Sequence, residues 1–215
     1  MPLVVGFDLD LTLVDSRPGI AATYRALSAE TGVHIDADAA VSRLGPPLEQ
    51  ELARWFPEAR VPAMADRFRA LYPEHAVAAS AVLPGVRESL SAVRARSGRV
   101  IVITGKYAPN ARLHLNHFGL VVDEVVGSAW AEAKTVALLD HAVDVYVGDH
   151  PADMRAAVAG GALAVGVVTG NSAADELAEA GADVVMADLR EFPDWLRSLP
   201  GRHAGSRLGT SADGR

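Results

Sequence analysis

Short runs of apolar, often β-branched residues recur along the chain, and each is followed by a segment whose apolar positions have helical spacing. The runs are Leu3–Phe7, Arg99–Ile103, Val121–Val126, Val143–Val147, Leu163–Val168 and Asp183–Met186. Continuous apolar runs are typical of strands that are buried on both faces of a parallel sheet. Strands that alternate with helices predict βαβ units. The pattern therefore predicts an α/β protein with a doubly wound parallel sheet.

The stretch between the first two runs departs from this alternation. Residues 16–82 contain no convincing strand. Their pattern predicts three or four helices, Gly19–Thr31, Asp36–Arg43, Pro47–Trp55 and Val61–Ala79. A strand-to-helix connection usually has only ~2–6 residues, so we expect residues 16–82 to be an inserted helical cap on a core formed by residues 1–15 and 83–200. Residues 201–215 are rich in Gly, Ser and Arg and are expected to be a disordered tail.

Composition narrows the class of protein. Of the 215 residues, 50% are hydrophobic and 22% are charged, as in a globular protein with a buried core. The chain has no cysteine, which excludes disulfides and thiolate metal sites and fits a cytoplasmic location. No apolar run reaches the ~18 residues that span a membrane, and no basic segment precedes Leu3 as in a secretory signal.

Charge narrows the class of partner. The net charge is −7 and no cluster of Lys and Arg stands out, so we expect no nucleic-acid partner. Because the surface carries no positive cluster, an anionic substrate would have to be attracted by a local positive charge, such as a bound cation or a buried lysine. We expect the partner to be a small metabolite and the chain to be a monomer or a homodimer.

Two acidic pairs follow two of the predicted strands. Asp8 and Asp10 end the first strand, and their carboxylates point the same way because they are two residues apart in an extended segment. Asp149 and Asp153 follow the fourth strand. Either pair alone is ordinary for a turn or a helix start. Like charges so close together are costly unless a cation or a proton relieves them. The recurrence of such a pair at one sheet edge favours a cation, and the oxygen ligands suit Mg²⁺.

Groups suited to an anion follow the other strand ends. Thr104 and Gly105 end the second strand, where a hydroxyl and accessible backbone N–H groups can bind phosphate. Among 20 basic residues only Lys106 and Lys134 are lysines, and a lysine offers a compact, mobile ammonium. Lys134 lies at the start of the helix before the fourth strand. The helix dipole mildly disfavours a positive charge there unless a nearby negative group attracts it. Together with the carboxylates, these groups predict a phosphate and magnesium site.

These motifs, in this order, resemble those of the haloacid dehalogenase superfamily, in particular its phosphoglycolate-phosphatase-like and β-phosphoglucomutase-like members. The matching segments are Asp8–Thr12 with Val14–Ser16, Leu83–Val86, Thr104, Lys134 and Gly148–Asp153. The resemblance covers roughly residues 3–190 and implies a Rossmann-like core with a helical cap. Gly105 stands where many relatives have Asn, Thr135 where Pro is frequent, and His150 where a small hydroxyl residue is usual. We expect His150 to cap the helix that follows it.

The resemblance implies a magnesium-dependent phosphatase, a hydrolase that forms an aspartyl-phosphate on Asp8. Asp10 would protonate the leaving alkoxide and then take a proton from water. Thr104, the amide of Gly105 and Lys134 would hold the phosphate oxygens as charge develops. Thr12 is expected to support the Asp8 loop rather than touch the substrate.

The same resemblance implies a set of metal ligands and a lid. Mg²⁺ would be held by Asp8, the backbone carbonyl of Asp10 and Asp149, with Asp153 acting directly or through water. The helical insert is expected to close over the site and to select the substrate. Arg43 would either reach a substrate carboxylate or second phosphate or be a surface arginine, and Lys106 is the other candidate for substrate contact.

Three alternatives stay open. A phosphomutase would use the same groups but return the phosphoryl group to its product. A dehalogenase would need no acid at the second aspartate position, which Asp10 occupies. A non-catalytic binding protein could use the same fold. Phosphoglycolate, a sugar phosphate, a nucleotide and pyrophosphate would all suit the predicted site.

Overall fold

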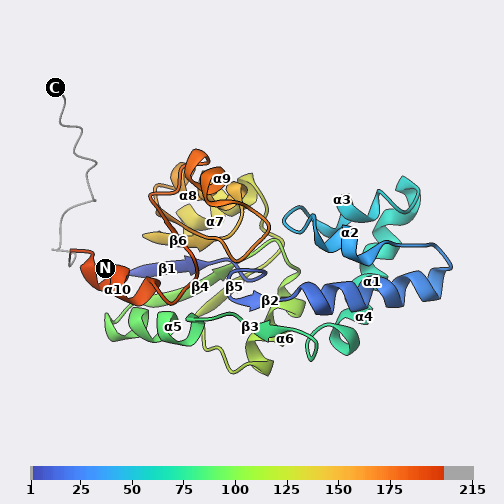
Figure 1. Cartoon of the computed structure of the whole chain (residues 1–215), viewed down its shortest axis with the longest axis horizontal. Helices are drawn as coiled ribbons and strands as arrows, with labels where there is room; N and C mark the ends of the chain where they lie inside the picture. The colour runs from blue at the N-terminus through green and yellow to red at the C-terminus, as the bar shows by residue number, and fades with distance from the viewer. Residues whose placement is uncertain (1, 201–215) are drawn as a thin grey trace.

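The computed structural model describes residues 2–200, and a parallel sheet lies at its centre (Figure 1). The strands of this sheet are β1 (Val4–Phe7), β4 (Arg99–Ile103), β5 (Glu124–Val126), β6 (Val145–Gly148), β7 (Leu163–Val167) and β8 (Val184–Met186). Their order is β5-β4-β1-β6-β7-β8, and every neighbouring pair is parallel. The chain builds one side of β1 and then returns to build the other, which confirms the predicted doubly wound sheet.

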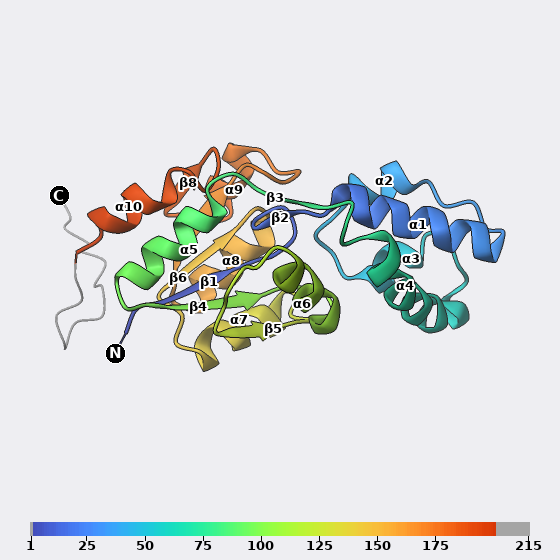
Figure 2. The ribbon, with the colours of Figure 1, turned by 90° about the horizontal axis from the view of Figure 1, so that it is seen from below.

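Two layers of helices cover the sheet, one on each face (Figures 1 and 2). One layer comprises α5 (Val86–Ala95), α6 (Ala108–His117) and α10 (Phe192–Ser198), and the other comprises α7 (Glu132–Asp140), α8 (Pro151–Ala159) and α9 (Ala174–Glu179). Alternate strand residues enter the two cores. Val100 and Val102 of β4 pack with the first layer, whereas Ile101 and Ile103 pack with the second. Because both faces are buried, the strands read as continuous apolar runs in the sequence.

The remaining helices form the cap, which lies beyond the carboxyl end of β1 (Figure 2). Its elements are α1 (Arg17–Thr31), α2 (Ala37–Val41), α3 (Leu48–Leu52), the 3₁₀ segment η1 (Glu58–Arg60) and α4 (Val61–His75). The cap has a hydrophobic core of its own, in which Tyr24, Leu27, Phe68 and Tyr72 are buried. The inserted helical cap of the predicted fold class is thus present, while the domain boundaries at residues 16 and 83 stay a prediction.

The element boundaries differ from the sequence expectation by a few residues. The helix expected over Val61–Ala79 ends at His75, and the strand expected from Val121 begins at Glu124. The expectation that residues 16–82 contain no strand is wrong at one point. Residues Ala81–Val82 form β3, which pairs antiparallel with β2 (Val14–Asp15) where the chain enters and leaves the cap. A strand of two residues is too short to give a periodic signal.

Two further expectations concern the C-terminal tail and membrane-spanning segments. The tail at 201–215 lies outside the described residues. Among residues 2–200, no helix is both long and apolar enough to cross a membrane.

Candidate active site

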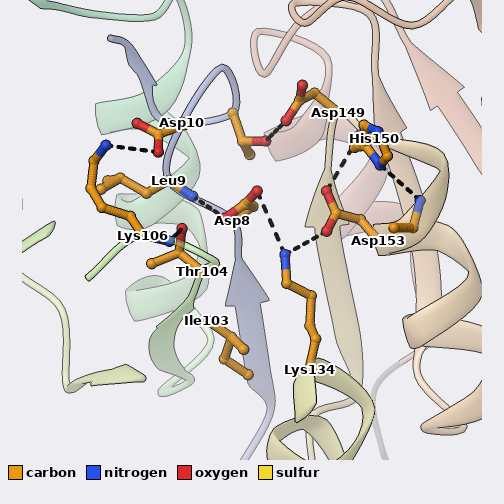
Figure 3. A network of polar contacts seen from close by, with 12 residues as sticks. Asp8, Leu9, Asp10, Ile103, Thr104, Lys106, Lys134, Asp149, His150 and Asp153 are labelled. Atoms are coloured by element: carbon orange, nitrogen blue, oxygen red, sulfur yellow. Dashed lines mark hydrogen bonds and ion pairs between the residues drawn. The ribbon is translucent and has the colours of Figure 1, made fainter. Parts of the chain in front are cut away.

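The carboxyl ends of β1, β4 and β6 bring the predicted site residues together (Figure 3). Asp8 and Asp10 follow β1, Thr104 and Lys106 follow β4, and Asp149 follows β6. Lys134 and Asp153 come from the first turns of α7 and α8. This is the crevice at which the strand order reverses, where open α/β sheets bind their ligands.

A tight turn after β1 gives its two aspartates different partners. Asp8 Oδ1 accepts a hydrogen bond from the Leu9 N–H at 2.8 Å. Leu11 has a φ of 60°, in the left-handed region, and this sharp reversal returns the chain to β2. Asp10 Oδ1 accepts a hydrogen bond from the Ser16 hydroxyl at 2.5 Å. Ser16 stands at the N-cap of α1 but makes no side-chain cap bond, because its hydroxyl is committed to Asp10.

Three buried or half-buried carboxylates form a cluster, and one lysine contacts two of them (Figure 3). Oxygen atoms of Asp8, Asp149 and Asp153 all lie within 4.8 Å of one another. Lys134 Nζ lies 2.5 Å from Asp153 Oδ1 and 3.6 Å from Asp8 Oδ2. The Thr12 hydroxyl donates to Asp149 Oδ1 at 3.1 Å. The predicted support of the Asp8 loop by Thr12 therefore takes a specific form, which is a bond across to the carboxylate after β6.

The charges of this cluster fit a divalent cation. Burial raises the pKa of Asp8 to about 6, although the Lys134 ammonium opposes the shift. Burial, with the neighbouring carboxylates Asp153 and Asp8, also raises the pKa of Asp149. Three carboxylates facing one ammonium leave a deficit of positive charge that one divalent cation would fill. An all-oxygen donor set of this kind suits Mg²⁺.

Backbone packing shows how the sequence forms the Asp149–Asp153 end. Gly148 has no room for a side chain, because a Cβ there would lie 2.5 Å from the Cβ of Asp153. His150 is the N-cap of α8, and its Nδ1 accepts a hydrogen bond from the Ala152 N–H at 3.0 Å. Asp153 Oδ2 accepts from the His150 N–H at 3.3 Å. This capping box gives His150 the role that the sequence predicted for it.

Asp10 lies in a second network, which crosses from the core to the cap. Lys106 Nζ lies 2.9 Å from Asp10 Oδ2 and 4.6 Å from the centre of the Tyr72 ring. The Tyr72 hydroxyl lies 2.9 Å from His114 Nε2. Burial alone would raise the pKa of Asp10, but the Lys106 ammonium and the Ser16 hydroxyl outweigh it and lower that pKa. Asp10 is thus held as a carboxylate, beside an Asp8 whose pKa is raised.

The anion-binding residues predicted after β4 lie beside Asp8. Thr104 is almost fully buried, and its hydroxyl accepts a hydrogen bond from the Lys106 N–H at 3.3 Å. The same hydroxyl is close enough to Asp8 to lower the pKa of that carboxyl. A Cβ on Gly105 would meet no atom closer than 3.7 Å, and its φ is not in the left-handed region. The fold itself therefore does not require glycine at this position. The absence of a side chain leaves the backbone N–H of Gly105 open to a ligand.

A cavity of about 310 Å³ lies between these residues and the cap. Its lining includes Asp8, Asp10 and Asp149 from the core. Arg43 lines it from the cap side, with its guanidinium in an ion pair with Glu51 at 2.5 Å. A proposed contact of Arg43 with substrate stays a prediction. Lys106 lines the cavity as well, but its ammonium is directed at Asp10.

Several site residues escaped the sequence analysis. Ser16 contacts Asp10, Tyr72 contacts Lys106, and His114 bonds to Tyr72. Trp130 and Asn110 line the cavity. The sequence gives no signal for the contacts of Tyr72, because they depend on how the cap docks on the core. Ser16 was noted only as part of the segment Val14–Ser16. Its position directly before a helix predicts a capping serine, but the structure shows that its hydroxyl donates to Asp10 instead.

Comparisons with known proteins agree with this geometry. The family model described as "Haloacid dehalogenase-like hydrolase" matches residues 5–167. The chain is similar to the phosphoglycolate phosphatase of Rhodospirillum rubrum, with 34% identity over 98% of this chain and 97% of that protein. It is also similar to the tyrosine-protein kinase PtkA of Mycobacterium tuberculosis, with 32% identity over 86% of this chain and 68% of that protein.

Solved structures show the same fold. A predicted phosphatase from Clostridium acetobutylicum has a TM-score of 0.79, and the match covers 93% of this chain and 100% of that one. The two sequences are 23% identical, so this likeness concerns the fold alone.

Proposed function

The chain belongs to the haloacid dehalogenase-like hydrolase family and is a phosphatase, and we propose that it hydrolyses a small phosphate monoester through an aspartyl-phosphate on Asp8. The surroundings of Asp8 are the observation that carries this proposal. Its carboxylate lies 3.6 Å from the Lys134 ammonium, lies close enough to the Thr104 hydroxyl for that group to lower its pKa, and shares a cluster with two further carboxylates. A nucleophile, groups that bind an anion and ligands for a cation therefore meet at one point.

The first half of the reaction transfers the phosphoryl group to the enzyme. A carboxylate oxygen of Asp8 attacks phosphorus, and the bond between phosphorus and the ester oxygen breaks. Asp10 donates a proton to the leaving alkoxide. The Thr104 hydroxyl, the Gly105 N–H and the Lys134 ammonium stabilise the non-bridging oxygens, on which charge develops.

The second half releases phosphate. Asp10 takes a proton from a water molecule, whose oxygen attacks the phosphorus of the aspartyl-phosphate. The bond between phosphorus and Asp8 then breaks and inorganic phosphate leaves.

Lys106 keeps Asp10 ionised before substrate binds. A phosphate dianion entering the cavity adds negative charge nearby, which raises the pKa of Asp10 and allows it to carry the proton it donates.

Asp8, Asp149 and Asp153, with the backbone carbonyl of Asp10, would hold Mg²⁺. A bound Mg²⁺ would neutralise charge between the Asp8 carboxylate and the phosphate. Lys134 already neutralises Asp153 through their 2.5 Å contact. Asp8 and Asp149 would therefore be the principal charged ligands.

The proposal is tested with 4-nitrophenyl phosphate, in Mg²⁺ and in excess EDTA, on the wild type and on Asp8→Asn. Asp194→Asn serves as the control, because its carboxylate is 81% exposed on α10. We expect turnover only with Mg²⁺, no turnover in Asp8→Asn and wild-type turnover in the control. We also expect Mg²⁺ to raise the thermal unfolding midpoint of the wild type and not that of Asp149→Asn.

Other results of these assays would point to a different nucleophile or a different reaction. Turnover in Asp8→Asn equal to the wild type would reject Asp8 as the nucleophile. A protein that is inert here but converts a sugar phosphate when primed with a sugar bisphosphate would be a phosphomutase.

A further inference from the structure

We propose that the natural substrate is the phosphate monoester of a neutral alcohol that carries a ring, and that anionic leaving groups such as glycolate are disfavoured. This inference rests on the proposed function, because it concerns the leaving-group side of the same cavity. It rests on two properties of that side, which are an apolar, aromatic lining and the ion pairing of every cation in it.

The cap side of the cavity is largely apolar. Its lining from the cap includes Ile20, Tyr24, Leu44, Leu48, Phe68 and Tyr72. Two core aromatics, Tyr107 and Trp130, line it from the other side. A two-carbon acid would fill little of a cavity of about 310 Å³ and would leave this surface without a partner. A ring would bury apolar area against it and could take the offset or edge-on contacts that aromatic groups prefer.

The cations around the cavity are already paired. Arg43 lies 2.5 Å from Glu51, and the Arg69 guanidinium bonds to Glu49 and covers the face of Tyr107. Lys106 lies 2.9 Å from Asp10. Arg69 Nε lacks a hydrogen-bond partner, but it is buried, so an anion in the cavity could reach it only if the side chain moved. Among the described residues of the lining, therefore, no arginine or lysine is free to receive a second anion.

An anionic leaving group would have to displace one of these pairs. A carboxylate placed beside Arg43 or Arg69 would also meet Glu51 or Glu49, which line the same wall. Like charges in a partly enclosed space repel strongly, and a buried anion without a cation is costly. A neutral leaving group has none of these costs. Asn110 and Ser128 remain in the lining as neutral groups that can bond to a hydroxyl or a ring substituent.

Three monoesters separate the two properties. Ethyl phosphate, benzyl phosphate and 2-phosphoglycolate all release alcohols of similar basicity, so that the chemical step is comparable. We expect kcat/KM for benzyl phosphate to exceed that for ethyl phosphate by about tenfold or more, from the burial of the ring. We expect kcat/KM for 2-phosphoglycolate to fall below that for ethyl phosphate.

A charge-neutralising variant tests the role of the ion pairs. Glu51→Gln removes the partner of Arg43 and should raise the ratio of kcat/KM for 2-phosphoglycolate over ethyl phosphate by about tenfold. Glu58→Gln is the matched control, because Glu58 is exposed on η1 and does not line the cavity. It should leave the ratio at the wild-type value.

The results of these assays distinguish a failure of this substrate preference from a failure of the proposed phosphatase function. Hydrolysis that prefers 2-phosphoglycolate, or that treats benzyl and ethyl phosphate alike, would overturn the inference while the phosphatase reaction stood. An unchanged ratio in Glu51→Gln would overturn the claim that pairing of Arg43 excludes anions. If none of the three esters gave release that depends on Asp8, the proposed function would fail and this inference with it.

Discussion

Asp8 and Asp10 stand two residues apart, yet their surroundings give them opposite properties. Burial raises the pKa of Asp8 to about 6. Lys106 and Ser16 overcome the same effect at Asp10 and lower its pKa. Where two neighbouring carboxylates have environments that separate their pKa values, they usually have different chemical roles. Here the raised pKa of Asp8 fits a carboxylate that a bound cation would stabilise. The lowered pKa of Asp10 leaves it ionised at rest, so its proposed role as proton carrier requires the negative charge of a bound phosphate.

The first prediction concerns the proton carrier. Asp10→Asn keeps an oxygen that can accept from Ser16 but cannot carry a proton, so we expect kcat to fall by ~10²–10⁴-fold. With 4-nitrophenyl phosphate the loss should be smaller than with ethyl phosphate, because nitrophenolate leaves without protonation. Steady-state rates with both esters measure this difference. The comparison uses kcat/KM, because the later water step, in which Asp10 also acts, is common to both esters and does not enter kcat/KM. Equal losses of kcat/KM on both esters, or a near-normal value with ethyl phosphate, would reject Asp10 as the general acid.

The second prediction concerns the other end of the Asp10 network. Burial, aided by the positive charge of Lys106, lowers the pKa of His114 to about 4, although Asp10 opposes the shift. The folded protein therefore holds His114 neutral at a pH where the unfolded chain binds a proton. Unfolded chains bind more protons between about pH 6.5 and 4, so stability falls as the pH drops through this window. The loss from this residue should reach about 1–2 kcal/mol at pH 5.

A variant that lacks only His114 isolates that contribution, since carboxylates and the other histidines also titrate in this range. The free energy of unfolding by urea is measured at pH 7.5 and pH 5 for the wild type and for His114→Leu. Lys106, Asp10, Tyr72 and His117 face His114 and are present in both proteins. We expect the drop in stability between the two pH values to be smaller in the variant. The same drop in both proteins would contradict the assignment.

At the scale of elements, two glycines at strand ends have different reasons to be glycine. Gly148 ends β6, and a Cβ there would lie 2.4 Å from Asp153 Oδ2. Gly105 follows β4, and a Cβ there would meet only ordinary contacts at 3.7 Å or more. The first glycine is required by the packing of the folded protein. The second leaves space that, in the proposed reaction, the phosphate uses.

The third prediction separates these two reasons with the same substitution. Gly148→Ala should displace Asp153 from Lys134 and lower the free energy of unfolding by about 1–3 kcal/mol, as overpacking does. Gly105→Ala should leave the unfolding midpoint unchanged but raise KM for a phosphate ester, because the methyl group lies where the phosphate approaches. Thermal unfolding and steady-state kinetics on both variants measure the contrast. A stability loss in Gly105→Ala as large as that in Gly148→Ala would refute it.

The sequence predicted whole elements better than it predicted their contacts. The strands of the sheet were found because both of their faces are buried, and β4 was found to the residue as Arg99–Ile103. β2 and β3 were missed because each has only two residues, which is too few to show the alternation of apolar and polar positions that identifies a strand. Asp8, Thr104 and Asp149 were predicted because strand ends in a parallel sheet share one edge. Lys134 was predicted because it is one of only two lysines and opens a helix.

Contacts between distant segments were beyond reach of the sequence. Lys106 pairs with Asp10 within the core, whereas its contact with the Tyr72 ring depends on how the cap docks on the core. Neither local pattern nor spacing encodes that arrangement. The same holds for Arg43, whose partner Glu51 comes from the neighbouring helix α3.

At the scale of the whole molecule, the cap and the core touch at a few points around the cavity. The chain crosses between them at β2 and β3, which pair with each other (Figure 1). The cap loop at Gly45 packs against the His150 ring, and the Asn171 amide donates to the Val41 and Ser42 carbonyls at 3.3 and 3.2 Å. Of these residues, Gly45 and His150 line the cavity. Movement of the cap about the paired strands would open it.

The last prediction tests whether this closure serves catalysis. Gly45 has a φ of 138°, and a Cβ there would lie 2.8 Å from His150 Cδ2. Gly45→Ala should therefore hold the cap loop away from the core, and we expect kcat/KM to fall roughly ten- to a hundredfold, because small misplacements at a reacting centre are costly. Hydrogen exchange of residues 42–47 should be faster than in the wild type when phosphate and Mg²⁺ are bound.

Gly32→Ala provides the matched control for backbone strain in the cap. Gly32 also has a positive φ, of 68°, but a Cβ there would meet no atom within 4 Å. This variant should lose about 1–2 kcal/mol of stability from the left-handed conformation while keeping the wild-type kcat/KM. If both variants lost activity alike, general weakening of the cap would explain the loss. If only Gly45→Ala lost it, the contact between the cap loop and His150 is part of the catalytic cycle, because closure there completes the cavity in which Asp8 and Asp10 act.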